Sequence, residues 1–135
     1  MPFFNWNSSY SVGVTQIDSQ HRHIVGLLNG MHDVMSRGAK PNEVAALAQD
    51  LMDYTCYHFA AEEKLMEQAG YEGLAAHREK HAAMKAEVER FLAAARTGGA
   101  SVPIKLMNFL KSWLAKHING TDKEYAPAMK GAGIC

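Results

Sequence analysis

The sequence predicts an all-α fold, an up-down-up-down antiparallel four-helix bundle with an N-terminal arm. Apolar residues recur at steps of three and four along most of the chain, which is the period of one face of an α-helix. Breaking residues divide this pattern into four stretches with short connections, which make consecutive helices antiparallel neighbours. With 135 residues, 47% of them hydrophobic, the chain is expected to form a single domain over residues 1–135 with a substantial core.

Capping and breaking residues predict the bounds of the four helices. The first begins near Asp18-Ser19, because either residue can cap free backbone N–H groups, and it ends at Gly38. The other breakers are Pro41-Asn42 before the second helix, Gly70 after it, Thr97 to Ser101 after the third, and Asn119-Gly120 after the fourth. We therefore expect a bundle over about residues 18–119 and a C-terminal tail over 120–135. Residues 1–17 are expected to form an ordered arm over one end of the bundle, through Trp6, Tyr10, Val12, Val14 and Ile17.

The charge balance and the cysteine content exclude several classes of protein. Fourteen Lys and Arg against fourteen Asp and Glu leave no net charge and no polybasic run, so we expect no nucleic-acid binding. No apolar run approaches the ~18 residues of a membrane span, and the N-terminus lacks the features of a signal peptide. Two cysteines, Cys56 and Cys135, are too few for a disulfide framework, which is typical of a reducing compartment. We therefore expect a cytoplasmic protein.

Most of the seven histidines fall on the apolar seams of the predicted helices. At about 100° per residue, the seams carry five histidines and one carboxylate: His21 on the first helix, His58 and Glu62 on the second, His77 and His81 on the third, and His117 on the fourth. Burying so many polar groups without partners would cost several kcal/mol each, against a net stability of about 5–15 kcal/mol. Neutral imidazoles and carboxylates are metal ligands, and bundle cores commonly hold two-metal centres. We interpret these residues as a metal site.

The remaining two histidines are expected to lie outside this site. His23 is turned about 200° from His21 on the first helix and should face solvent. His32 returns to nearly the face of His21 but lies about 16 Å further along the helix, too far to share a metal cluster. We expect it to be a buried or half-buried histidine at the other end of the bundle.

Several stretches of the chain, taken in order, resemble the hemerythrins, specifically the single-domain bacteriohemerythrins. They are Val12-Gly13-Val14 with Ile17-Asp18-Ser19-Gln20-His21, His58-Phe59-Ala60-Ala61-Glu62-Glu63-Lys64-Leu65-Met66, Gly70-Tyr71 with Leu74, His77 and His81, and Trp113-Leu114-Ala115-Lys116-His117-Ile118 with Asp122. Each fragment alone is a weak motif, but together they cover about residues 6–126 at helix-compatible separations.

The resemblance implies a non-haem di-iron centre that binds O2 reversibly. The ligands it implies are His77, His81 and His117 for one iron ion, His21 and His58 for the other, and Glu62 and Asp122 as bridges, with a solvent-derived hydroxide or oxide as the third bridge. One ion then has six ligands and the other five, which leaves one position open for a small ligand. The role of Asp122 rests on the resemblance alone, because it lies past the expected helix break and would otherwise be a surface carboxylate.

An O2 pocket must stay dry so that bound O2 is not lost and the irons are not oxidised. The candidates for its wall lie within a turn of a histidine ligand: Phe59, Trp113, Leu114 and Ile118. Plain core packing explains the same side chains, and the two roles are compatible. Glu63 is turned about 100° from Glu62 and is expected to remain solvated.

We interpret the chain as a protein that carries, stores or supplies O2, with an O2-consuming partner protein as the recipient in the last case, rather than as an enzyme. O2-activating di-iron enzymes of the same bundle class use mostly carboxylate ligands with Glu-x-x-His pairs, and no such pair occurs here. The one similar pair, Asp18 with His21, is better explained by Asp18 as a helix cap. The main alternative is a module that senses O2, NO or redox state or buffers iron, and a di-iron oxidase or peroxidase is the other.

Overall fold

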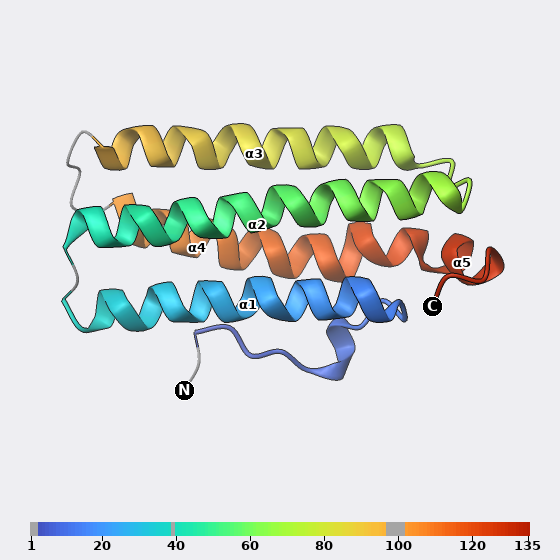
Figure 1. Ribbon diagram of the computed structural model, residues 1–135, viewed down its shortest axis with the longest axis horizontal. Helices are drawn as coiled ribbons and strands as arrows, with labels where there is room; N and C mark the ends of the chain where they lie inside the picture. The colour runs from blue at the N-terminus through green and yellow to red at the C-terminus, as the bar shows by residue number, and fades with distance from the viewer. Residues whose placement is uncertain (1–2, 39, 97–101) are drawn as a thin grey trace.

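Four long helices form the body of the protein in a computed structural model that describes residues 3–38, 40–96 and 102–135. They are α1 (Thr15–Ser36), α2 (Pro41–Gln68), α3 (Leu74–Arg96) and α4 (Val102–Lys116), and they run alternately up and down the long axis (Figure 1). The described ranges contain no strand, so the predicted all-α bundle is confirmed. None of the described helices is long and apolar enough to cross a membrane. The predicted connection Thr97 to Ser101 lies outside the described residues.

The ends of α1 and α2 follow the expected glycine pattern. Gly38 and Gly70 adopt positive φ angles of 80° and 68°, which L side chains rarely adopt. The Tyr71 amide donates to the carbonyl of Met66 at 3.0 Å and closes the end of α2. The chain reverses direction within a few residues of each glycine, so α1, α2 and α3 are consecutive antiparallel neighbours.

The beginning of α1 differs from the prediction. The helix starts at Thr15, and its N-cap Val14 makes no side-chain capping bond, so Asp18 is not a helix cap. The Asp18 carboxylate instead reaches back to accept a hydrogen bond from the Val12 amide at 2.8 Å and another from the Ser11 hydroxyl. Asp18 therefore connects the arm to the first turn of the helix by hydrogen bonds, which the preference of Asp for helix N-caps does not predict.

The N-terminal arm runs alongside α1 rather than over one end of the bundle (Figure 1). It contains a short 3-10 helix, η1 (Ser8–Tyr10), and buries Phe4, Val12 and Val14. The Asn29 side chain of α1 accepts from the Phe4 amide at 2.7 Å and donates to the Phe4 carbonyl at 3.0 Å. This paired contact satisfies the arm's backbone where it lies against the helix.

The helical chain does not break at Asn119-Gly120, so this prediction is wrong. A π-helix, η2 (His117–Asp122), follows α4 directly and leads into α5 (Lys123–Gly131). α5 lies at the end of the bundle where α1 begins (Figure 1), and Tyr125 and Met129 are fully buried there. The predicted tail is therefore largely helical and part of the core.

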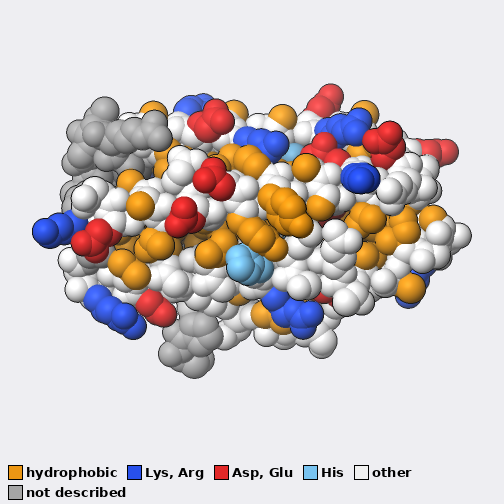
Figure 2. Space-filling model, in the orientation of Figure 1, with side chains coloured by type: hydrophobic (Ala, Val, Ile, Leu, Met, Phe, Trp, Pro, Cys, Tyr) orange, Lys and Arg blue, Asp and Glu red, His pale blue; other side chains and the backbone are white. Residues whose placement is uncertain are grey.

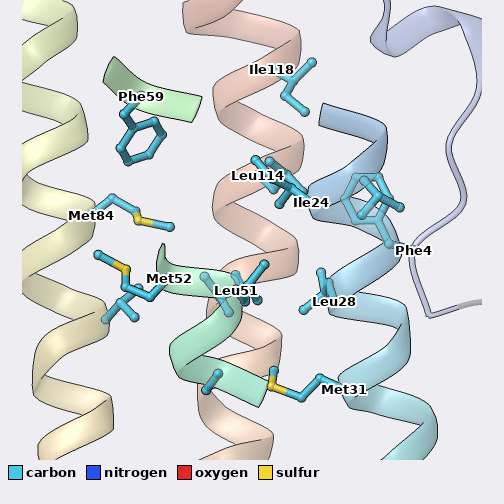
Figure 3. Packing of buried hydrophobic residues seen from close by; sticks show 14 of the residues in the cluster. Phe4, Ile24, Leu28, Met31, Leu51, Met52, Phe59, Met84, Leu114 and Ile118 are labelled. Atoms are coloured by element: carbon cyan, nitrogen blue, oxygen red, sulfur yellow. The ribbon is translucent and has the colours of Figure 1, made fainter. Parts of the chain in front are cut away.

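The core lies along the axis between the four helices. Figure 3 shows apolar side chains of every helix in this space: Ile24, Leu28 and Met31 from α1, Leu51, Met52 and Phe59 from α2, Met84 from α3, and Leu114 from α4. On the face of the molecule in Figure 2, acidic and basic side chains are interspersed. The polar residues that the sequence places on the seams lie inside the bundle, nearer to α5 than to the α1–α2 turn.

Candidate metal centre

Five imidazoles and two carboxylates meet inside the bundle. They are His21 from α1, His58 and Glu62 from α2, His77 and His81 from α3, and His117 and Asp122 from η2, and none is more than 5% exposed. The Nε2 atom of every one of these histidines lies 2.8–3.2 Å from an oxygen of Glu62 or Asp122. The structure thus brings together all seven residues that the sequence analysis named as metal ligands.

The seven side chains form two overlapping groups. One contains Glu62, His77, His81, His117 and Asp122, and the other contains His21, His58, Glu62 and Asp122; within each group the ligand atoms all lie within 4.8 Å of one another. The two carboxylates belong to both groups, so they lie between a cluster of three histidines and a cluster of two. Both carboxylates are thus within reach of either cluster of histidines.

The local helix geometry explains why these residues face one another. Glu62 follows His58 by one α-helical turn, and His81 follows His77 in the same way, so each pair lies on one face. Asp122 comes five residues after His117, which in an α-helix would turn it about 140° away. The π-helical turn of η2 adds the extra residue, so that Oδ1 of Asp122 lies 2.9 Å from Nε2 of His117.

The carboxylates govern the protonation of two of the imidazoles. Burial opposes a charge on His21 and His77, but hydrogen bonds and charge attraction from Asp122 and Glu62 outweigh it and raise the pKa of each histidine to about 9. For His117 burial dominates, and its pKa is lowered despite Asp122. Without metal, the two carboxylates therefore favour the charged form of both His21 and His77 despite their burial.

The two carboxyl groups stay ionised although they are fully buried. Burial alone would raise the pKa of Glu62, but the charge of His58 and hydrogen bonds from the surrounding histidines hold it well below its usual range. Burial and the charge of Glu62 oppose the ionisation of Asp122, but the imidazole nitrogens of His117, His21 and His77, which lie 2.9–3.1 Å from its oxygens, lower its pKa. Two anionic oxygen ligands are thus permanently available in the interior.

Several polar atoms of this cluster have no adequate partner within the protein. Both carboxylate oxygens of Asp122 are buried and lack a well-directed hydrogen bond, and Nε2 of His81 faces Nε2 of His117 at 3.1 Å. Buried polar groups are normally satisfied, because an unpaired one costs about 1–3 kcal/mol. A cation held by imidazole nitrogens and carboxylate oxygens satisfies all of them, and this donor set suits divalent transition metals such as iron. The residues present therefore fit a metal centre.

Two further residues, which were not predicted as part of the site, contact the candidate ligands. Gln20 is buried, and its Oε1 accepts a hydrogen bond from Nδ1 of His58 at 2.6 Å. The hydroxyl of the fully buried Tyr125 donates to Oε2 of Glu62 at 3.1 Å. Burial raises the pKa of this phenol well above its usual value, and the negative charges of Asp122 and Glu62 add to the effect. In the sequence, the indication for both was that they are close to a candidate ligand: Gln20 precedes His21, and Tyr125 lies three residues after Asp122.

The prediction that Glu63 remains solvated is wrong. Its side chain is 20% exposed, accepts a hydrogen bond from Nδ1 of His81 at 2.8 Å, and accepts another from Nε of Arg78 at 3.1 Å. The helical angle correctly turns Glu63 away from Glu62. It does not reveal that α3 packs on that side of α2, within reach of a glutamate side chain.

A small apolar cavity of about 20 Å³ adjoins the cluster, enough for one molecule the size of water. Its lining includes His21, His58 and His117 together with three of the residues predicted to form the pocket wall: Phe59, Trp113 and Leu114. The fourth, Ile118, is fully buried but is not part of the lining. Two of the wall residues also pack on ligands, because Phe59 stacks on His81 at 3.7 Å between ring centroids and Trp113 stacks on His117 at 4.2 Å.

The two histidines expected outside the site do lie outside it. His23 is exposed, and its ring packs on Tyr54 with 4.1 Å between centroids. His32 is half-buried, as expected, but it is covered by Phe3 of the arm, which stacks on it at 4.6 Å. Neither contributes to the two groups of ligand atoms.

Most of the chain matches one known protein family. The sequence profile of the hemerythrin HHE cation binding domain matches residues 12–129. The bacteriohemerythrin of Stenotrophomonas maltophilia (strain R551-3) is 35% identical over 130 residues, which cover 96% of this chain and 84% of that protein. The bacteriohemerythrin of Methylococcus capsulatus (strain Bath) is 29% identical, with 96% of this chain and 98% of that protein covered.

Solved structures agree with the sequence comparison. A crystal structure of wild-type hemerythrin superposes with a TM-score of 0.86 and 29% sequence identity, and the match covers 94% of this chain and 98% of that one. Because the family profile spans most of the chain and the fold matches over nearly its full length, this chain belongs to the hemerythrin family and is similar to its bacteriohemerythrins.

Proposed function

We propose that this protein binds O2 reversibly at a non-haem di-iron centre and serves O2 transport, storage or delivery to an O2-consuming partner. The observation that carries the proposal is the pair of overlapping ligand groups, which share two carboxylates but contain three and two histidines. Its relatives named bacteriohemerythrin and the match to a cation-binding family support the same assignment.

Each ligand has a distinct part in this proposal. With iron bound, His77, His81 and His117 would hold one ion and His21 and His58 the other, and Glu62 and Asp122, which belong to both groups, would be shared between them. The iron pair supplies the electrons that reversible O2 binding requires. The ion held by two histidines would have one protein ligand fewer, and would therefore be the one with a position open to a small ligand.

The protein's own contribution is a dry compartment beside that ion. His21 and His58 line the cavity together with His117, and much of the remaining lining is apolar. Thr55 adds a hydroxyl, but this group already donates to the carbonyl of Leu51 at 2.7 Å. A compartment without a free acid or base does not deliver protons to a bound ligand, which favours binding and release over catalysis.

The experiment counts iron and O2 together. Reduced, anaerobic protein is analysed for iron and then mixed with known amounts of O2 in a closed cell, with and without excess reductant. We expect two irons and one O2 per chain, with no further uptake when reductant is added. Continued O2 consumption in the presence of reductant would instead identify an oxidase or peroxidase.

Matched variants connect the result to the site. His58→Gln should lose O2 uptake, because it removes one of two histidines of the proposed ligand-binding ion. His23→Gln changes an exposed histidine on the neighbouring helix and should retain both irons and full uptake. Equal uptake by the two variants would contradict the assignment of His58.

A further inference from the structure

One imidazole of the cluster differs from the others in the group that meets its second nitrogen. Nδ1 of His81 lies 2.8 Å from Oε2 of Glu63, and a carboxylate can only accept, so Nδ1 carries the proton. In the neutral ring that a metal ligand requires, the lone pair is then on Nε2, which points into the site and lies 3.2 Å from Oε1 of Glu62. Among the described residues, the other ligand histidines contact carboxylate oxygens through Nε2, whereas His81 also makes such a contact through Nδ1.

The two-histidine side of the site lacks such a charge. His58 donates from Nδ1 to Oε1 of the neutral amide of Gln20 at 2.6 Å. Nδ1 of His21 is buried and has no hydrogen-bond partner. The two halves of the cluster therefore differ in a second respect besides their number of histidines.

The side chain of Glu63 is itself held in place by a second contact. Arg78, one residue after the ligand His77, donates from Nε to Oε1 of Glu63 at 3.1 Å. The same guanidinium lies 3.6 Å from Glu67, one turn further along α2. On the other side of the contact, Phe59 stacks on the His81 ring with an angle of 7° between the planes. The ring is thus held both by its face and by its Nδ1–H.

We propose that Glu63 is a positioning residue of the metal centre, which aims Nε2 of His81 at the three-histidine ion and, through its negative charge, strengthens His81 as a donor. This inference rests on the proposed di-iron function. A carboxylate that accepts from a ligating histidine fixes its tautomer and orientation and raises its basicity. A more basic ligand stabilises the more highly charged, oxidised metal, so Glu63 lowers the reduction potential of the centre. The neutral Gln20 has no such effect on the two-histidine ion.

Two substitutions separate the roles of shape and charge. Glu63→Gln keeps an oxygen that can accept from Nδ1 of His81 but removes the charge, whereas Glu63→Ala removes both. Glu67→Gln is the matched control, because it neutralises the other acidic neighbour of Arg78 at a site that is 69% exposed. Gln20→Glu is the converse change, since it places a negatively charged carboxylate beside Nδ1 of His58.

The readouts are iron affinity and reduction potential. Affinity is measured anaerobically by competition of Fe(II) between protein and a coloured chelator, and the potential by a mediated optical titration. We expect Glu63→Ala to bind iron about 10- to 100-fold more weakly, the range seen when a partner of a metal ligand is removed. Glu63→Gln should retain most of the affinity but shift the potential upward, Gln20→Glu should shift it downward, and Glu67→Gln should change neither.

The result can overturn the inference without touching the proposed function. Circular dichroism of the metal-free variants first verifies that each retains the helical fold. A potential of Glu63→Gln equal to that of Glu67→Gln would refute the role of the charge, and wild-type affinity of Glu63→Ala would refute the positioning role. If the unsubstituted protein itself bound no iron, the proposed function would fail, which is a different and separately visible outcome.

Discussion

Without metal, the folded state of this protein should lose stability as the pH rises from about 6.5 to 9. In the metal-free site His21 and His77 have pKa values raised to about 9. Each pKa unit corresponds to about 1.4 kcal/mol, so a rise from 6.5 to about 9 stabilises the folded state by about 3 kcal/mol for the first imidazolium. The second contributes less, because both rings face the same two carboxylates.

The sign follows from the direction of the shifts. A histidine whose folded pKa lies above its unfolded value contributes its full stabilisation below about pH 6.5, and this is lost as the pH rises to about 9. Glu62 and Asp122 have lowered pKa values, so their ionised forms stabilise the folded state above about pH 4.5. This contribution does not change between pH 6.5 and 9. The metal-free protein should therefore lose about 3 kcal/mol or more between pH 6.5 and 9.

Urea unfolding in the presence of a chelator, followed by circular dichroism from pH 6 to 9.5, measures this loss. His77→Gln should flatten the profile, and His23→Gln, at an exposed position, should not. In the iron-loaded protein the trend should reverse, because iron displaces the same protons and binds more tightly as the pH rises. An unfolding free energy that does not change between pH 6.5 and 9 in the metal-free protein, with imidazole NMR titrations near 6.5, would refute the reasoning.

Three substitutions test the site and its cavity. His77→Ala removes a ligand of the three-histidine ion and should lower the iron content measured by metal analysis; unchanged iron and an unchanged spectrum would contradict the assignment. Asp122→Asn keeps the size of the side chain but removes a shared anionic oxygen, so the chain should retain fewer than two irons after gel filtration, whereas two retained irons would mean that this carboxylate is dispensable. Leu114→Ala enlarges the cavity, and should both cost about 2–5 kcal/mol in urea unfolding and quicken oxidation of the O2-loaded protein followed optically. An unaltered oxidation rate would mean that Leu114 is ordinary core.

Regular helix geometry made much of this molecule predictable from its sequence. The angle of 100° per residue holds along α1, α2, α3 and α4, so a histidine on an apolar seam must face the axis whatever the neighbouring helices contain. His77 and His81 were identified on this basis, and so was the exposed position of His23. The ends of α1 and α2 were predicted separately, from the breaking residues Gly38 and Gly70.

The rest depends on departures from that geometry and on packing between helices. Asp122 was found only through family resemblance, because the π-turn of η2 changes the angular relation between residues five apart. Glu63 was misjudged because an angle on α2 does not say which helix lies opposite. Asp18 was mistaken for a cap because the contact it makes, to the Val12 amide, depends on how the arm folds back.

The most direct test of reversible O2 binding is a repeated optical cycle on protein whose iron has been counted. Reduced, anaerobic protein is exposed to O2, its visible spectrum is recorded, the solution is swept with argon, and the cycle is repeated. The proposal predicts two irons per chain and a band that appears with O2, disappears under argon and returns with the same amplitude. A single irreversible change, accompanied by the release of hydrogen peroxide, would contradict it.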